Sequence, residues 1–248
     1  MSICSIQTDG LGERIGKAFI IPDVHLKTWM FQKAEEKISG GEYDHIVCLG
    51  DIVDNWGQGF NLDLYQETLD TLADFAAVHS DMLFCYGNHD ISYKWGEWET
   101  GYSPQARETV LKGFKKLKSV LPAENIAFIH RIDNVLFSHA GLIELFVEYF
   151  YSDKEVPIDD ILKKANSLGK KSLWADVSPI WARPQNGILK PYAPEFFQVV
   201  GHTPVKEPLL TNNILTLDTF STYSDGSPIG DQRFVWVDTV EKTWDYTR

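Results

Sequence analysis

The sequence predicts an α/β fold in which helices cover a sheet. Over residues 18–86, short apolar segments alternate with segments of helical periodicity, which is the pattern of a β-α-β-α-β unit. Further short apolar segments follow as far as residue 238 and add strands to this unit. Five of the apolar segments end in Asp, His or Asn, as expected where strand ends meet at a ligand-binding edge of a sheet.

The first half of the chain carries the clearest elements. After a polar lead-in at residues 1–16, expected to be loose or an edge strand, residues 18–22 form the first expected strand. Residues 26–38 are expected to form a helix that the glycine pair after it ends. A second strand leads into an acidic loop, and residues 61–79 then show apolar side chains at helical spacing. Residues 82–86 form the third expected strand.

Residues 91–103 contain four aromatic residues but show neither helical nor strand periodicity, so they are expected to form an irregular insertion. We expect these side chains to pin the loop as a small hydrophobic cluster, in preference to forming a wall that stacks on substrate. Residues 174–195 carry four prolines and two tryptophans and are expected to be a second irregular insertion.

The remaining elements follow in short succession. A helix is expected to start at Pro104, since proline is favoured in the first helical turn. Two strands joined through Asp133-Asn134 form a predicted hairpin. The chain shows no repeat or linker, so residues 1–248 are expected to form one domain. The other expected elements are strands at 126–130 and 134–138, a helix at 142–168, and strands at 197–201, 214–218 and 233–238.

Composition excludes several functional classes. The hydrophobic fraction of 44% and charged fraction of 23% are those of a globular protein. The net charge of -12 argues against a nucleic-acid or acidic-membrane partner. No apolar run reaches the roughly 18 residues that span a bilayer, and no signal-peptide pattern is present, so a cytoplasmic protein is expected. The three cysteines lack paired spacing, which predicts free thiols.

The polar residues at the strand ends form five motifs. Asp, His and Asn offer oxygen and nitrogen ligands, which suit manganese, iron or zinc. The Gly-Asn-His-Asp tetrapeptide is the most specific, because a given tetrapeptide occurs by chance in such a chain with a probability of about one in a thousand. The motifs are Asp23-x-His25, Gly50-Asp51-x-x-Asp54, Gly87-Asn88-His89-Asp90, His139-Ala140-Gly141-Leu142 and Gly201-His202-Thr203-Pro204.

In these motifs the sequence resembles the calcineurin-like metallophosphoesterases, especially the branch with small bacterial and phage serine/threonine phosphoprotein phosphatases. The resemblance implies a four-layer α/β-β/α sandwich of two mixed sheets flanked by helices, the metallophosphoesterase fold. It also implies two divalent metal ions, manganese in the first place and iron or zinc as alternatives. One ion would bind Asp23, His25 and Asp51, and the other Asp51, Asn88, His139 and His202, so that Asp51 bridges the pair.

The resemblance further implies how a phosphomonoester would be hydrolysed. A hydroxide that bridges the two ions would attack phosphorus, since such ions lower the pKa of water to near neutrality. Asp54 would orient His89, and His89 would protonate the leaving group as general acid. Asn88 and Arg183 would bind the substrate phosphate, Arg183 because a guanidinium matches two phosphoryl oxygens.

The sequence departs from the family pattern at three places. Asn55-Trp56 stands where Arg-Gly usually follows the second carboxylate, so one phosphate-binding arginine is missing and direct activity on phosphoproteins is put in doubt. Leu26 stands where a glycine is usual, and Asp90 where a glutamate is usual.

Three functions are compared on this basis. The first is a phosphatase for phosphomonoesters, either phosphorylated proteins or small phosphorylated metabolites. The second is a nucleotide or dinucleoside polyphosphate hydrolase similar to diadenosine tetraphosphatases, in which the aromatic insertions stack on a base. The third is a non-catalytic scaffold, which is less favoured because every implied ligand is present together with His89 and Asp54.

Overall fold

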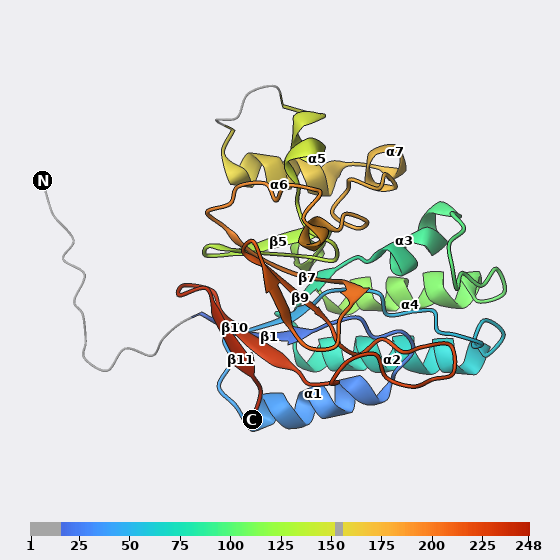
Figure 1. Cartoon of the computed structure of the whole chain (residues 1–248). Helices are drawn as coiled ribbons and strands as arrows, with labels where there is room; N and C mark the ends of the chain where they lie inside the picture. The colour runs from blue at the N-terminus through green and yellow to red at the C-terminus, as the bar shows by residue number, and fades with distance from the viewer. Residues whose placement is uncertain (1–15, 152–155) are drawn as a thin grey trace, which may run out of the picture.

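The computed structural model describes residues 16–151 and 156–248. Two sheets pack against each other, with helices on both outer sides (Figure 1). The first sheet has the order β11 (Thr243–Tyr246), β10 (Val235–Asp238), β1 (Lys17–Ile21), β2 (His45–Cys48), β3 (Leu83–Cys85), β4 (Ile126–Ala127). The second has the order β5 (Ile129–Ile132), β6 (Val135–Ser138), β7 (Phe197–Pro204), β9 (Ile214–Asp218), β8 (Leu209–Thr211).

Both sheets contain parallel and antiparallel pairs. In the first, β1 pairs in parallel with β2 and antiparallel with β10. In the second, β7 lies parallel to β6 and β9, whereas β5 and β8 pair antiparallel at the two edges. The expectation of two mixed sheets flanked by helices is therefore confirmed. The helices and 3-10 turns are α1 (Trp29–Ser39), α2 (Leu62–Val78), α3 (Asn88–Trp95), α4 (Arg107–Val120), η1 (Ala123–Asn125), α5 (Glu144–Glu148), α6 (Ile158–Ser167), α7 (Lys170–Leu173) and η2 (Pro184–Asn186).

The central strands are buried on both faces, which explains their nearly continuous apolar sequence. Side chains alternate along a strand, so successive residues enter different cores. In β1, Ala18 and Ile20 belong to the core between the sheets, while Phe19 and Ile21 pack on the helical side. The thiol of Cys85 donates to the carbonyl oxygen of Phe137 at 3.4 Å and links the two sheets.

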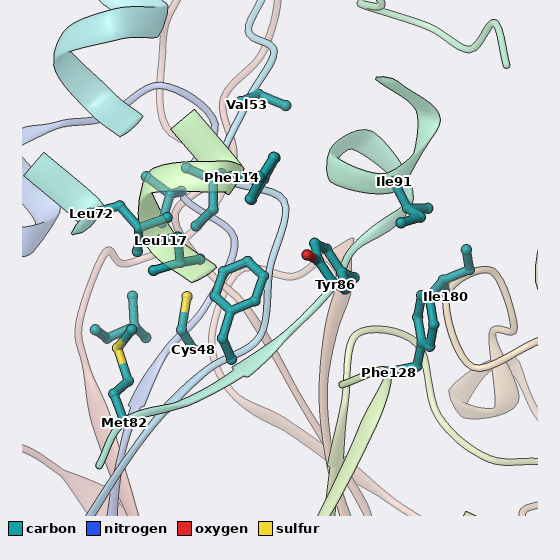
Figure 2. Packing of buried hydrophobic residues seen from close by; sticks show 14 of the residues in the cluster. Cys48, Val53, Leu72, Met82, Tyr86, Ile91, Phe114, Leu117, Phe128 and Ile180 are labelled. Carbon is teal, nitrogen blue, oxygen red and sulfur yellow. The ribbon is translucent and has the colours of Figure 1, made fainter. Parts of the chain in front are cut away.

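The outer core lies between the first sheet and helices α1, α2 and α4. Figure 2 shows part of it, where Leu72 of α2 and Leu117 of α4 lie near Cys48 of β2. Helices α2 and α4 approach closely because α4 carries Gly113, at which a Cβ would lie 2.6 Å from the Cβ of Leu69. This packing holds the carboxyl ends of β1, β2 and β3 in place. Cys48 and Cys85 are both free thiols, as predicted.

The first half of the chain follows the predictions apart from the starts of two helices. Helix α4 begins at Arg107, three residues after the expected start at Pro104. Expected strands 18–22 and 82–86 are β1 and β3, and expected helix 61–79 is α2. Helix α1 begins at Trp29, three residues later than predicted, because His25 and Leu26 adopt positive φ angles of 47° and 59°. The predicted lead-in at 1–16 lies outside the described residues, apart from Gly16.

Two predictions about longer segments were wrong. The segment 91–103 is not irregular throughout, because residues 88–95 form α3 and only the part after Gly96 lacks regular structure. A helix of two turns is too short to display a periodic apolar face. The single helix expected at 142–168 is instead α5 and α6, and Pro157 directly precedes α6, because proline is tolerated at the start of a helix but not in its interior.

The strand predictions in the second half were incomplete. The predicted hairpin exists as β5 and β6 around Asp133, but residues 126–127 form β4 and pair with the first sheet. Strands β8 and β11 were missed because their exposed residues give no buried apolar pattern. Within 174–195 the structure has only the 3-10 turn η2 and a bridge from Pro191 to Ile143, in agreement with an irregular insertion. No helix in the described ranges is both long and apolar enough to cross a membrane.

Candidate functional site

The predicted site residues meet at one end of the sandwich, around a cleft of about 600 Å³. Apart from Arg183, which directly precedes η2, they follow or lie in five different strands of both sheets, as the sequence predicted. Asp23 and His139 are almost fully buried beneath the cleft. The other predicted site residues line it: His25, Asp51, Asp54, Asn88, His89, Arg183 and His202.

One cluster of possible metal ligands surrounds His25. Its Nδ1 lies 3.0 Å from the carbonyl oxygen of Asp54, and because a carbonyl only accepts, Nδ1 carries the proton. The unprotonated Nε2 then points to Asp23 and Asp51, at 4.0 and 3.9 Å from a carboxylate oxygen of each. Burial, together with the charge of His89, lowers the pKa of His25 to about 3, so the imidazole is neutral and able to bind a metal ion.

A second cluster surrounds His139. Its Nδ1 donates to the carbonyl oxygen of Leu49 at 2.9 Å, which again leaves Nε2 as the ligand atom. That Nε2 lies 3.0 Å from Oδ1 of Asn88 and 3.1 Å from Nδ1 of His202. A carboxylate oxygen of Asp51 is 3.2 Å away.

The electrostatics of these clusters fit a cationic occupant. Burial lowers the pKa of His139, but the carboxylates of Asp51 and Asp23 outweigh this effect and raise that pKa to about 9. The site thus attracts positive charge. Nε2 of His202 is buried without a hydrogen-bond partner, and burial lowers the pKa of this residue well below its usual value. Its other ring nitrogen, Nδ1, faces Nε2 of His139 at 3.1 Å, and a neutral imidazole nitrogen beside carboxylate and imidazole ligands suits a divalent metal ion. Oδ2 of Asp51 faces both clusters and is the atom placed to serve two ions.

The loops that carry these residues have unusual backbone conformations. Positive φ angles occur at His25 (47°), Asp51 (48°), Asp54 (68°) and His202 (63°). Each costs a non-glycine residue about 1–2 kcal/mol, and such residues often cluster at functional sites. Leu26 adopts the same conformation with φ 59°, at the position where the family usually has glycine.

Hydrogen bonds between the first two loops compensate for this strain. The amides of Val24 and His25 both donate to the carbonyl oxygen of Asp51, at 3.0 and 2.9 Å. The carboxylate of Asp90 accepts from the amides of Asp51 and Ile52, each at 2.8 Å. Asp90 therefore fixes the Asp51 loop even though its side chain is shorter than the usual glutamate.

Two glycines let the backbone contact the ligand carboxylates. A Cβ at Gly87 would lie 2.0 Å from Oδ1 of Asp51, and one at Gly201 would lie 2.0 Å from Oδ1 of Asp23. A nearby amide in each loop donates to the same carboxylate. His89, two residues after Gly87, donates to Asp51 at 3.0 Å, and His202, directly after Gly201, donates to Asp23 at 3.0 and 3.1 Å. Any larger residue at either glycine would displace a ligand.

His89 and Asp54 form the predicted pair. Nδ1 of His89 lies 2.9 Å from Oδ2 of Asp54, and Oδ1 of Asp54 accepts the hydroxyls of Tyr65, at 2.6 Å, and Tyr93. Burial disfavours a charged imidazole, but the carboxylate of Asp51 and the hydrogen bond that His89 donates to Asp54 raise the pKa of His89 to about 10. His89 is thus held as an imidazolium at the cleft surface.

Glu99 is a site residue that sequence reasoning missed. Its side chain is only 6% exposed, and it accepts a hydrogen bond from the amide nitrogen of Asn88. Its other oxygen lies 3.7 Å from Nδ1 of His89. Burial raises the pKa of Glu99 to about 7. An acidic residue within the aromatic segment was the only signal in the sequence. Oδ1 of Asn88 lies with the possible metal ligands, beside Nε2 of His139, and Nδ2 donates to Glu99. The predicted contact of Asn88 with substrate phosphate would therefore use the second hydrogen on Nδ2.

The aromatic insertions contribute both to packing and to the cleft. The ring of Tyr102 lies 4.6 Å from Tyr93 and 5.3 Å from Trp98, which agrees with a cluster that pins the loop. Trp98 is nevertheless 72% exposed and lines the cleft, as do Trp174 and Trp181. The loop thus contains the predicted cluster and also presents the exposed ring of Trp98 to the cleft.

Cationic side chains complete the cleft. Nη1 of Arg183 is buried without a hydrogen-bond partner, so a strong donor remains available at the cleft. Lys27, which sequence reasoning also missed, is 7% exposed, and burial lowers its pKa to about 8. Asp218 is a further buried carboxylate at this cleft, where it accepts from the amide and hydroxyl of Ser221.

The comparisons with known proteins agree with this geometry. The family model for calcineurin-like phosphoesterases matches residues 17–225. Among solved structures, a cold-active protein-tyrosine phosphatase from a psychrophilic Shewanella species has 18% identity and a TM-score of 0.53, over 94% of this chain and 81% of that one. A protein serine/threonine phosphatase from Saccharomyces cerevisiae has 16% identity and a TM-score of 0.52, over 91% and 73%. Both share the fold. The comparison with curated proteins finds no match.

Proposed function

The chain belongs to the calcineurin-like phosphoesterase family of metal-dependent hydrolases, and we propose that it acts on phosphomonoesters. The observation that carries this proposal is that His89, hydrogen-bonded to Asp54, lies beside two clusters of possible metal ligands that share Asp51. A phosphomonoester offers a dianionic group for such a centre and one leaving group for the histidine. When bound, divalent ions supply Lewis acidity, which activates water and stabilises charge on phosphoryl oxygens.

The residues of the chain have separate tasks in this proposal. Asp23, His25 and Asp51 would hold one ion, and Asp51, Asn88, His139 and His202 the other. Asp54 keeps Nδ1 of His89 protonated and fixes the ring, so that the opposite edge of the imidazolium faces the cleft. His89 would then give a proton to the departing oxygen, and a positioned acid of this kind contributes about 10²–10⁴-fold to the rate.

Arg183 would bind the phosphoryl group. Its unpaired Nη1 lies in the field of the Asp23 and Asp51 carboxylates, which keep the guanidinium charged despite its burial. A guanidinium can donate two parallel hydrogen bonds to a phosphoryl group. At the place of the missing family arginine, Asn55 donates to the carbonyl oxygen of His25 at 2.9 Å and supplies no charge.

The charge of the cleft favours a monoester over a dinucleoside polyphosphate. Among the described residues that line it, Lys27 and Arg183 are the basic side chains beside the histidines. The carboxylates of Glu99, Asp176 and Asp218 face the same space. A chain of several phosphates would need more cations than this. The exposed ring of Trp98 supports the second candidate, because it could stack on a base.

A substrate panel tests the proposal. The manganese-loaded protein is compared on p-nitrophenyl phosphate, its bis ester, a phosphoserine peptide and diadenosine tetraphosphate. We expect turnover of the monoester at least tenfold faster than that of the diester, and an Arg183→Lys variant with a raised KM, since lysine lacks the bidentate geometry. Rapid hydrolysis of the dinucleotide without turnover of any monoester would favour the second candidate instead.

A further inference from the structure

A second hollow of about 300 Å³ opens beside the catalytic cleft. The two spaces share four lining residues, which are Lys27, Asn55, Trp56 and Thr222. They therefore adjoin along the loop that follows β1 and the loop that follows β2. We call this hollow the side pocket. The two spaces are therefore neighbours on the protein surface.

The charge of the side pocket differs from that of the rest of the molecule. Lys27 is its single ionisable residue among the described residues that line it, and the other lining residues are neutral. The chain as a whole carries a net charge of -12, and the neighbouring cleft contains several carboxylates, including Glu99 and Asp218. A pocket with one cation and no carboxylate is suited to an anionic group.

Lys27 has hydrogen-bonding capacity that the protein does not use. Lys27 is only 7% exposed, and its ammonium donates one long hydrogen bond of 3.4 Å to the carbonyl oxygen of Val24. Within the described part of the chain, Lys27 forms no ion pair within 4 Å, and the carboxylates of Asp218 and Asp23 act on its charge only from a greater distance. An ammonium carries three donors, and a buried charge is costly unless it is paired. A bound anion would provide the missing partner.

The walls of the pocket are held rigidly. The indole nitrogen of Trp56 donates to the carbonyl oxygen of Thr222 at 2.9 Å, and the amide of Asn55 donates to the carbonyl oxygen of His25. Asn55-Trp56 occupies the place where the family usually has a phosphate-binding arginine. Lys27 supplies a positive charge to the same pocket.

We propose that the side pocket binds a second anionic group of the substrate, a carboxylate or a second phosphate, through Lys27. The inference rests on the proposed function and narrows the substrate class to phosphomonoesters that carry another acidic group close to the ester. The metal centre and Arg183 would hold the phosphoryl group that is cleaved. Lys27 would hold the group that remains on the product.

Matched aryl phosphates test this inference. For the manganese-loaded protein, kcat/KM is measured on the three isomers of carboxyphenyl phosphate and on the corresponding carboxamides, which have the same shape without the charge. A parallel series carries a second phosphate in place of the carboxylate and distinguishes the two anions. We expect at least one charged isomer to be preferred about tenfold over its neutral partner, the effect of one charge-assisted hydrogen bond.

Two variants locate the effect. Lys27→Met keeps the length of the buried side chain and should bring the preference to about one, whereas Lys37→Met makes the same charge change on α1 outside the pocket and should keep it. A wild-type protein without preference for any charged isomer, or a Lys27→Met variant that retains the preference, overturns the inference. Hydrolysis of neither ester type by wild type would instead refute the proposed function.

Discussion

The floor of the cleft and its rim hold their side chains by different means. We define the floor as Asp23, His25, Asp51, Asp54, Asn88, His89, His139 and His202, and the rim as Lys27, Trp56, Trp98 and Arg183. On the floor, strained loops form hydrogen bonds with one another, and glycines allow the carboxylates to lie directly against the backbone. At the rim, side chains reach inward from separate loops, and the charged groups of Lys27 and Arg183 keep donors unused. The floor is thus preorganised for ions, whereas the rim remains available for a ligand.

The largest effect is expected where the floor has no space. Gly87→Ala would place a Cβ 2.0 Å from the Asp51 carboxylate, so Asp51 or its loop must move. We expect loss of bound metal, at least a hundredfold loss of turnover, and about 1–3 kcal/mol of destabilisation. Metal analysis and urea unfolding check this. Gly169→Ala, where a Cβ would meet nothing within 4 Å, is the matched control. An alanine variant at Gly87 with full metal content would show that the floor is adaptable.

Loss of the acid pair should leave the metal in place. We expect His89→Ala to lower kcat on phenyl phosphate by about 10²–10⁴-fold, and to have less effect on p-nitrophenyl phosphate, whose leaving group needs little protonation. Asp54→Asn removes a carboxylate that raises the pKa of His89, so that pKa falls. Since the proposed role of His89 as an acid requires its protonated form, the alkaline fall in kcat should move to lower pH. An unchanged pH profile in Asp54→Asn would contradict the assignment.

Glu99 joins the two regions and should give an intermediate effect. Glu99→Ala removes the acceptor that orients the amide of Asn88, and we expect metal affinity to fall about 10–100-fold, as for other residues that orient ligands. Glu99→Gln keeps an acceptor and should recover most of the affinity. Glu97→Gln changes the same charge in the same loop outside the cleft. Equal losses in Glu99→Ala and Glu97→Gln would indicate a general effect of charge.

The smallest effect is expected at the rim. Trp98 is 72% exposed, so Trp98→Ala should change stability by less than about 0.5 kcal/mol. We expect KM for aryl phosphates to rise a few-fold through lost ring contact, with little change in kcat. Steady-state kinetics on phenyl phosphate and on a small alkyl phosphate separate the two contributions. A large fall in kcat on both would mean that Trp98 acts on the floor and not at the rim.

The same difference explains which residues the sequence could predict. The floor residues follow buried strands and stand in short motifs. The neighbouring strands β1 and β2 bring Asp23 and Asp51 together, and the packing of the two sheets adds His139. Some of the residues that position the floor side chains are also evident from the sequence, because Gly87 and Gly201 occur within the motifs. The strained loops were not predictable, since nothing in residues 25–27 signals the positive φ angles that delay α1.

The rim depends on contacts that are distant in sequence. Trp56 meets Thr222, and Glu99 returns from the loop after α3 to reach Asn88. No periodicity predicts such pairs, so Glu99, Lys27 and Asp218 were not identified beforehand. Short or exposed elements were not predicted for a related reason. Helix α3 has too few turns to show a period, and β8 and β11 lack a buried face.

The central claim is that Asp51 holds two metal ions that the phosphatase needs. It is tested most directly by metal content and p-nitrophenyl phosphate turnover, measured together after manganese reconstitution. We predict about two ions per chain and turnover for wild type, and loss of both for Asp51→Asn. Asp176→Asn, an exposed carboxylate of the same cleft, should retain both. An Asp51→Asn protein that keeps two ions and full turnover would contradict the account.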